Sequence, residues 1–208
     1  MKEETPVSTD DLVRLSMAML DDVVEAALHV DDARVVVYHN GETFSEEYRT
    51  TFSLRISSCE TGHDGFEMTV LDAMRDAGER TIFLFENQPR LTSAFLERVF
   101  DQVSNEETGV VIGPTYEERV WMLGAGSVTQ LLGEGKPNAF SLDSHSMMEN
   151  LCQSDVAVFP TEVRHSLVGR VGLDQIRSEV ELESDARPRR TLAALDGIQH
   201  KVKSKRRR

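Results

Sequence analysis

Short apolar runs rich in β-branched residues alternate with segments of helical periodicity along this 208-residue chain, and this alternation limits the possible folds more than any other feature. Five runs have the length of strands: residues 34–38, 81–85, 109–112, 119–123 and 156–159. Four segments with apolar residues at helical spacing predict helices: residues 9–28, 66–75, 92–103 and 144–151. The run Ser8-Thr9-Asp10-Asp11 can cap the first of them. This alternation predicts an α/β fold with three layers, in which a mostly parallel sheet is flanked by helices.

Length and hydropathy indicate one domain without a membrane span. The clean apolar runs, such as residues 35–37 and 82–85, are much shorter than the roughly 18 residues that a membrane helix needs. The first six residues have neither the apolar core nor the cleavage site of a signal peptide, so we expect a cytoplasmic protein. We predict a single domain over residues 1–199 and a basic, disordered tail over residues 200–208.

Acidic residues dominate the body of the chain. Of the 23 Lys and Arg residues, six lie in residues 201–208, so residues 1–200 hold 17 basic and 36 acidic groups, a formal charge of −19. Lys2 and Lys136 are the only lysines in that body. This balance is typical of halophilic archaea, in which salt screens the repulsion between carboxylates, although an acidic mesophile protein is the alternative. The charge argues against nucleic-acid binding except through the basic tail.

Common catalytic motifs are absent from the sequence. Gly124-Ala-Gly126 follows a predicted strand, but Thr129 stands where a dinucleotide-binding turn has its third glycine. There is no Walker-type loop and no Gly-x-Ser-x-Gly elbow, which argues against P-loop and serine-hydrolase chemistry. Three histidines near the ends of predicted elements are each a possible base, although a lone histidine is more often a surface group: His39, His145 and His165.

Two stretches in the middle of the chain carry a more specific pattern. The first is Gly65-Phe-Glu-Met68 followed, after a predicted helix, by Thr81-Ile-Phe-Leu-Phe-Glu-Asn-Gln-Pro-Arg-Leu-Thr92. The second is Gly113-Pro-Thr-Tyr-Glu-Glu-Arg-Val-Trp-Met-Leu-Gly124. Both resemble motifs of the small GT-A-type glycosyltransferases related to the arsenosugar-biosynthesis enzymes and, more distantly, to the phospholactate guanylyltransferases. The resemblance extends over about residues 8–180.

The resemblance implies a site at the carboxyl ends of the strands. There a nucleotide-diphospho-sugar would bind together with Mg²⁺ or Mn²⁺, which neutralises the diphosphate leaving group. It implies that Glu117 and Asp174 are catalytic and that Glu86 and Glu117 hold the metal. The residues that it implies beside the donor nucleotide are Asn87, Pro89, Gly113 and Pro114.

Three departures from the family pattern predict impaired catalysis. Asn87 stands where the family has an aspartate, and an amide is a weaker ligand for a hard cation. Glu118 and Arg119 replace two glycines, which in such a loop allow the backbone to approach a substrate closely. The helix predicted from residue 9 leaves no room for the family's opening strand and nucleotide loop, so we expect the first strand of the sheet to be missing.

These observations predict a divergent GT-A-fold, glycosyltransferase-like protein in which transfer from a nucleotide sugar is impaired. A non-catalytic interaction module that retains the fold is the first alternative. A nucleotidyltransferase with a nucleoside triphosphate as donor is the second, and the missing opening loop counts against it. If the protein is active, its partner is a nucleotide sugar, and the sequence leaves the base, the acceptor and the oligomeric state open.

Overall fold

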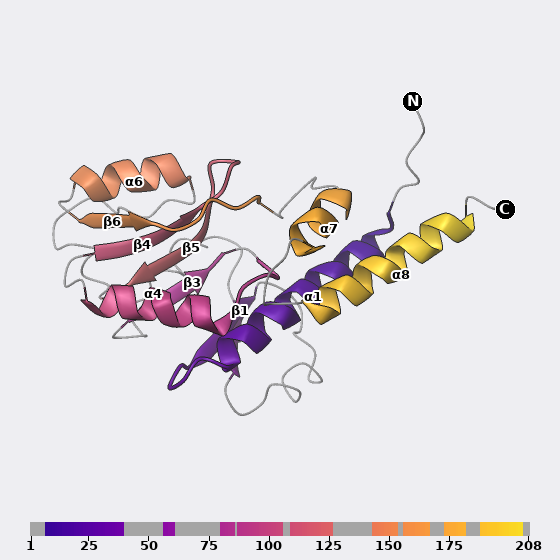
Figure 1. Ribbon diagram of the computed structural model, residues 1–208, viewed down its shortest axis with the longest axis horizontal. Coiled ribbons are helices and arrows are strands. Elements are labelled where there is room, and N and C mark those ends of the chain that lie inside the picture. The colour runs from indigo at the N-terminus through magenta and orange to yellow at the C-terminus, as the bar shows by residue number, and fades with distance from the viewer. Residues whose placement is uncertain are drawn as a thin grey trace. The chain divides into compact units, whose positions relative to one another are not determined.

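The computed structural model describes residues 7–39, 56–60, 80–85, 87–105, 109–126, 143–153, 156–166, 173–181 and 188–205 (Figure 1). The chain forms two compact units. The first unit comprises Met1–His29, Asn87–Thr92 and Leu167–Arg208, and the second comprises Val30–Glu86 and Ser93–Ser166.

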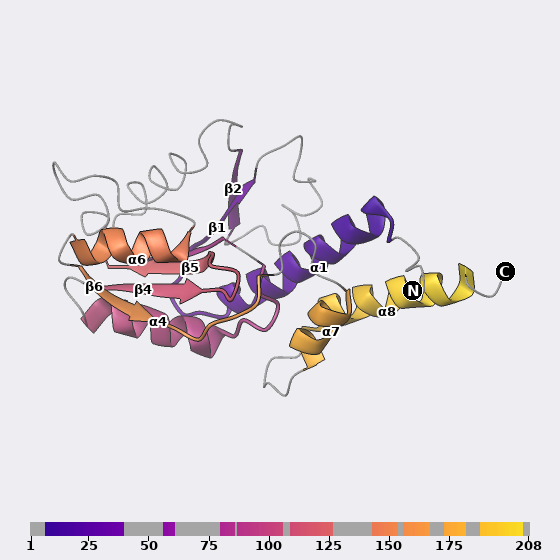
Figure 2. The same ribbon diagram turned by 90° about the horizontal axis from the view of Figure 1, so that it is seen from above.

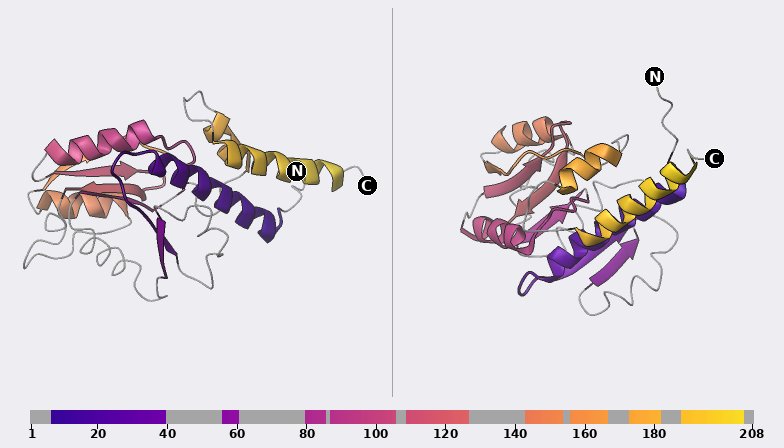
Figure 3. Two further views of the ribbon diagram at one scale, coloured as in Figure 1. Left: turned by 90° about the horizontal axis from the view of Figure 1, so that it is seen from below. Right: turned by 45° about the vertical axis from the view of Figure 1, so that its right-hand side comes forward.

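The first unit is helical. It contains helices α1 (Thr9–Leu28), α7 (Leu173–Glu181) and α8 (Arg189–Lys205). Helices α1 and α8 lie side by side (Figure 3). They run antiparallel: Lys201 near the end of α8 donates a hydrogen bond of 2.6 Å to Asp11 near the start of α1. Apolar side chains from all three helices form one buried cluster: Leu15, Met19, Ile176, Val180, Leu195 and Ile198.

A buried carboxylate joins α1 to the start of α8. Asp22 of α1 accepts hydrogen bonds from the backbone nitrogens of Arg190 and Thr191, at 3.3 and 2.9 Å, and from the Thr191 hydroxyl at 2.7 Å. The first-turn nitrogens of a helix have no acceptor within the helix, and the helix dipole favours a negative charge there. Asp22 therefore caps α8 from a different helix, which fixes the register of the two helices.

The second unit contains two sheets. Strands β1 (Val35–His39) and β2 (Ile56–Glu60) form a parallel pair. The larger sheet has the order β3-β5-β4-β6, and its strands are β3 (Thr81–Leu84), β4 (Gly109–Pro114), β5 (Val120–Ala125) and β6 (Ala157–Pro160). Strand β5 is antiparallel to both β3 and β4, whereas β4 and β6 are parallel. Strands β3, β4 and β6 therefore end at the same edge of the sheet, which we call the carboxyl edge.

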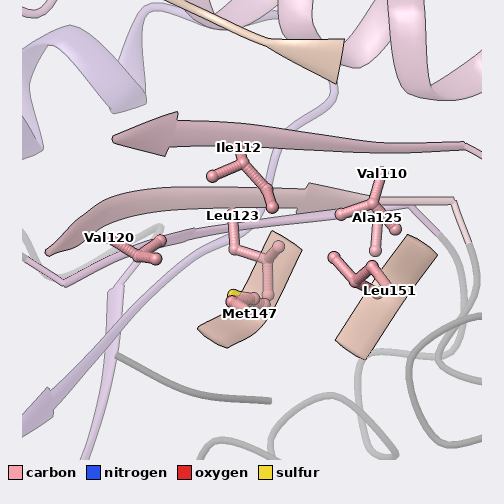
Figure 4. Close-up of a cluster of buried hydrophobic side chains, with 7 residues drawn as sticks. All are labelled: Val110, Ile112, Val120, Leu123, Ala125, Met147 and Leu151. Carbon is pink, nitrogen blue, oxygen red and sulfur yellow. The ribbon is translucent and has the colours of Figure 1, made fainter. Parts of the chain in front are cut away.

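Helices cover both faces of this sheet (Figures 1 and 2). Helix α6 (Ser144–Gln153) lies on one face and α4 (Ser93–Asn105) on the other. On the α6 face, buried side chains of the sheet and the helix pack together (Figure 4): Val110, Ile112, Val120, Leu123, Ala125, Met147 and Leu151. On the α4 face, the Phe95 and Trp121 rings lie 5.8 Å apart, and Val99 and Val103 pack against Gly124.

The α/β class with helices on both sides of a sheet is confirmed. The strands are parallel apart from β5, which the short turn at its start reverses. Strand β2, helix α7 and helix α8 were not predicted, although the spacing of Leu192, Leu195 and Ile198 is helical. The helix predicted over residues 66–75 lies outside the described residues.

Helix α8 continues to Lys205, past residue 200 where the basic tail was expected to begin. The predicted division into one domain and a disordered tail stays a prediction. The first described helix is α1, and residues 1–6 before it lie outside the described residues, so the missing first strand also stays a prediction. Among the helices that the structure describes, none is both long and apolar enough to cross a membrane.

Asp22→Asn should lower the free energy of unfolding by about 1–3 kcal/mol, because an amide cannot accept all the hydrogen bonds and loses the charge at the helix start. Asp101→Asn in α4 removes the same charge from an exposed position and should change stability by less than about 0.5 kcal/mol. Urea unfolding of both variants measures the difference. Equal stabilities would contradict the capping role of Asp22.

Candidate functional site at the carboxyl edge

A tight turn over residues 115–119 connects β4 to β5 at the carboxyl edge. The backbone nitrogen of Thr115 donates to the Arg119 carbonyl at 2.8 Å, and the Arg119 nitrogen donates to the Thr115 hydroxyl at 3.0 Å. The Glu118 nitrogen donates to the Thr115 carbonyl at 3.2 Å. These bonds close the turn within five residues, so β5 has to return antiparallel beside β4.

The turn has a backbone conformation that suits glycine at residue 118. Glu118 has a φ of 59°, in the left-handed region where a side chain normally costs about 1–2 kcal/mol. The resemblance places a glycine at this position and a second one at Arg119. At residue 118 the backbone thus adopts a conformation that suits the glycine of the family motif, although the side chain differs.

The segment after β6 extends the parallel pairing with β4 into the turn. The Thr161 nitrogen donates to the Ile112 carbonyl at 2.8 Å, and the Arg164 nitrogen donates to the Pro114 carbonyl at 3.2 Å. The Tyr116 nitrogen donates in turn to the Arg164 carbonyl at 2.9 Å. Residues 161–166 consequently lie along the outer side of the turn.

Glu117 connects the turn to this segment through both oxygens of its carboxylate. Oε1 lies 3.0 Å from Nδ1 of His165, and Oε2 accepts the backbone N–H of Ser166 at 2.6 Å. Partial burial raises the pKa of Glu117, but the hydrogen bonds from His165 and Ser166 outweigh it and hold the pKa below its ordinary value of 4.5. Glu117 therefore stabilises this arrangement at neutral pH, and the contribution is lost as the pH falls through the lowered folded-state pKa.

Neighbouring residues of the segment after β6 point to different partners. The guanidinium group of Arg164 lies over the Trp121 ring at 4.5 Å and over the Phe95 ring at 5.3 Å, and it also pairs with Glu162. His165 contacts Glu117 instead. Arg164 thus holds the segment against the α4 face of the sheet, while His165 contacts Glu117 in the turn.

Gly113 has a packing role at the end of β4. A Cβ atom at Gly113 would lie 2.5 Å from Cε2 of the buried Trp121, closer than real Cβ contacts. The indole occupies this space because Gly113 has no side chain. The glycine that the resemblance assigns to donor binding is therefore also required by the core.

The implied site residues fall into two groups. Gly113, Pro114 and Glu117 lie together at the end of β4 and in the turn of the second unit. Asn87 and Pro89 lie in the segment Asn87–Thr92 of the first unit. Helix α7 of the first unit contains Asp174, whose side chain is outside the described part, and Glu86 lies outside the described residues altogether.

Asn87 acts as a hydrogen-bond donor. Its Nδ2 lies 3.4 Å from the backbone carbonyl of Ser16 in α1, an interaction that a carboxylate could not make. Among the described side chains, no three acidic, histidine or cysteine residues cluster so that they could hold a divalent cation. The predicted metal use by Glu86 and Glu117 stays a prediction.

In the sequence, His165 is only one of several histidines at the ends of predicted elements, and no pattern predicts a role for Tyr116, Arg164 or Ser166. The partners of Glu117 lie 48 and 49 residues further along the chain. Only the parallel pairing of β4 with β6 brings them together.

This geometry defines an α/β protein with a polar turn at the carboxyl edge of its sheet. No protein-family model matches the chain, and no curated protein matches its sequence. A solved structure from Desulfovibrio desulfuricans G20, assigned as a nucleotide-diphospho-sugar transferase, matches with a TM-score of 0.69 and 11% identity over 94% of this chain and 86% of that chain. A cytidylyltransferase from Leptospira borgpetersenii serovar Hardjo-bovis (strain JB197) matches with a TM-score of 0.56 and 11% identity, over 88% of this chain and 84% of that chain.

The chain thus has the fold of nucleotide-diphospho-sugar transferases, which the resemblance had implied. At 11% sequence identity, these structures show a similar fold and do not show a shared function. Activity, donor and acceptor have to be argued from the site.

Glu118→Gly should raise the free energy of unfolding by about 0.5–1 kcal/mol. The substitution removes the strain of the left-handed conformation, and the greater conformational entropy of glycine in the unfolded chain offsets only part of this stabilisation. Arg119→Gly is the matched control, since Arg119 bridges to Asp143 in extended conformation and a glycine there should destabilise by about 1 kcal/mol. Thermal or urea unfolding of the two variants tests the conformation of the turn. If both glycines destabilise equally, the conformation described for residue 118 is wrong.

Proposed function

We propose that this chain binds a nucleotide-diphospho-sugar at the carboxyl edge of its four-stranded sheet and that its transfer activity is impaired. The observation that carries the proposal is the shared direction of β3, β4 and β6, whose ends meet at one edge beside the turn over residues 115–119. Open α/β sheets bind their ligands outside the carboxyl ends of their strands. The likeness to a structure assigned as a nucleotide-diphospho-sugar transferase supports this class of ligand.

Two side chains support impaired transfer. Glu117 stands where the family has an aspartate, and both of its oxygens accept hydrogen bonds from this chain. Asn87 replaces the other aspartate of the family pattern and donates to the Ser16 carbonyl. When bound in such a site, a divalent cation neutralises charge on the diphosphate leaving group, but the described residues offer it no ligand set.

In this proposal, Gly113 and Pro114 lead into the turn over residues 115–119, and that turn faces the ligand. Glu117 holds the turn against residues 165 and 166, so its carboxylate positions other groups. Asp174 remains a proposed catalytic residue from the resemblance. The donor contacts of Asn87 and Pro89 stay predictions of the resemblance.

A nucleotidyltransferase is the second candidate, because the cytidylyltransferase structure also matches. Such an enzyme would take a nucleoside triphosphate as donor. The two candidates differ in whether the protein prefers CTP or a nucleotide sugar. A non-catalytic module with no nucleotide ligand is the remaining alternative.

Thermal unfolding with UDP-glucose, GDP-mannose, CTP or no ligand tests the proposal, with each ligand measured once with Mn²⁺ and once with EDTA. A ligand at about 100 times its dissociation constant stabilises the folded state by about 2.7 kcal/mol, which raises Tm by about 5–11 °C for a chain of this size. We expect one nucleotide sugar to give this shift in both buffers. We also expect no release of nucleoside diphosphate above the level of a protein-free control.

The other outcomes separate the alternatives. A shift that only Mn²⁺ permits, with release of nucleoside diphosphate, would contradict impaired transfer and support an active transferase. A shift with CTP alone would support the nucleotidyltransferase. The absence of any shift would contradict nucleotide binding and leave the fold as an interaction module.

A further inference from the structure

Tyr116 is the aromatic residue of the exposed turn. The residue is 65% exposed, and Glu117, Glu118 and Arg119 beside it are exposed too, whereas the residues of β5 that follow are buried. Val163, from the segment after β6, is 44% exposed. Thr115 pairs with Arg164 in a parallel bridge, and the Tyr116 ring lies against the His165 ring. The carboxyl edge therefore carries exposed apolar surface next to the turn.

The His165 side chain packs against the Tyr116 ring and holds it in place. The centroids of the two rings lie 4.7 Å apart, with an interplanar angle of 36°. His165 contacts Glu117 at 3.0 Å, and the Tyr116 backbone nitrogen donates to the Arg164 carbonyl at 2.9 Å. An aromatic ring that is already ordered loses little conformational entropy when a ligand binds to it.

The negative charge of the protein favours a ligand contact that does not depend on charge attraction. The chain has a formal charge of −13, and a nucleotide sugar carries a negatively charged diphosphate. The turn itself carries two acidic groups, Glu117 and Glu118, and one basic group, Arg119. Stacking on an aromatic ring does not depend on the charge of the ligand, so it can bind the ring of a nucleotide sugar where charge attraction is weak.

We propose that Tyr116, backed by His165, is a stacking surface for one ring of the bound nucleotide sugar, either its base or its hexose. This inference rests on the proposed function, because it assigns a contact within the same site. In it, Tyr116 touches the ligand, and His165 and Glu117 are positioning residues that keep the Tyr116 ring in place.

The test compares Tyr116→Ala, Tyr116→Leu and the matched control Tyr116→Phe by isothermal titration with UDP-glucose, UDP, GDP-mannose and GDP. Stacking of a base on an aromatic ring is worth about 1–3 kcal/mol, so we expect the alanine and leucine variants to bind about 5- to 150-fold more weakly. Tyr116→Phe keeps the ring and should bind within about twofold of the original chain. Tm without ligand shows whether each variant is folded, and the leucine variant keeps apolar volume without a ring.

The two sources of the ring give different patterns. Equal weakening for the nucleotide sugar and its nucleoside diphosphate assigns the stacked ring to the base, and weakening for the nucleotide sugar alone assigns it to the hexose. If folded Tyr116→Ala and Tyr116→Leu bind all ligands as tightly as the original chain does, the stacking surface is refuted while the proposed function stands. If the original chain binds none of the four ligands, both fail together.

Discussion

The reversal of the chain over residues 115–119 is the constraint on which the second unit depends. It returns β5 between β3 and β4, where Val120, Trp121, Met122 and Leu123 are fully buried. The turn closes by hydrogen bonds between Thr115, Glu118 and Arg119 and adopts a left-handed conformation at Glu118. The antiparallel strand that breaks the otherwise parallel sheet is a direct consequence.

The same turn links the sheet to the candidate site. Because β4 and β6 are parallel, the segments that follow them leave at one edge, and Glu117 meets His165 and Ser166 there. These contacts use the carboxylate that the resemblance assigns to metal binding and catalysis. The fold thus places the turn at the sheet edge where open α/β sheets bind their ligands. The contacts made by Glu117 and Asn87 are the basis for proposing binding without efficient transfer.

Local signals in the sequence predicted those elements that local physics determines. Ser8 accepts the Asp11 nitrogen at the start of α1, as its position before the helix indicated, and the apolar runs of β4 and β5 form buried strands. Strand β2 has the polar sequence Ile56-Ser-Ser-Cys-Glu60 and forms by pairing with β1, which no local pattern reveals. The contact of Glu117 with His165 depends on the pairing of distant strands, so spacing along the chain could not predict it.

The location of nucleotide binding is the central claim, and amide chemical shifts in an NMR titration with UDP-glucose and GDP-mannose test it most directly. The backbone N–H groups of Tyr116 and Ser166 are bonded within the site and report on it. We predict that the ligand changes the chemical shifts of these two amides. The chemical shift of the Leu195 amide, in the core of the first unit, should stay unchanged. Shifts confined to α1, α7 and α8, with residues 113–119 and 161–166 unaffected, would contradict a site at the carboxyl edge.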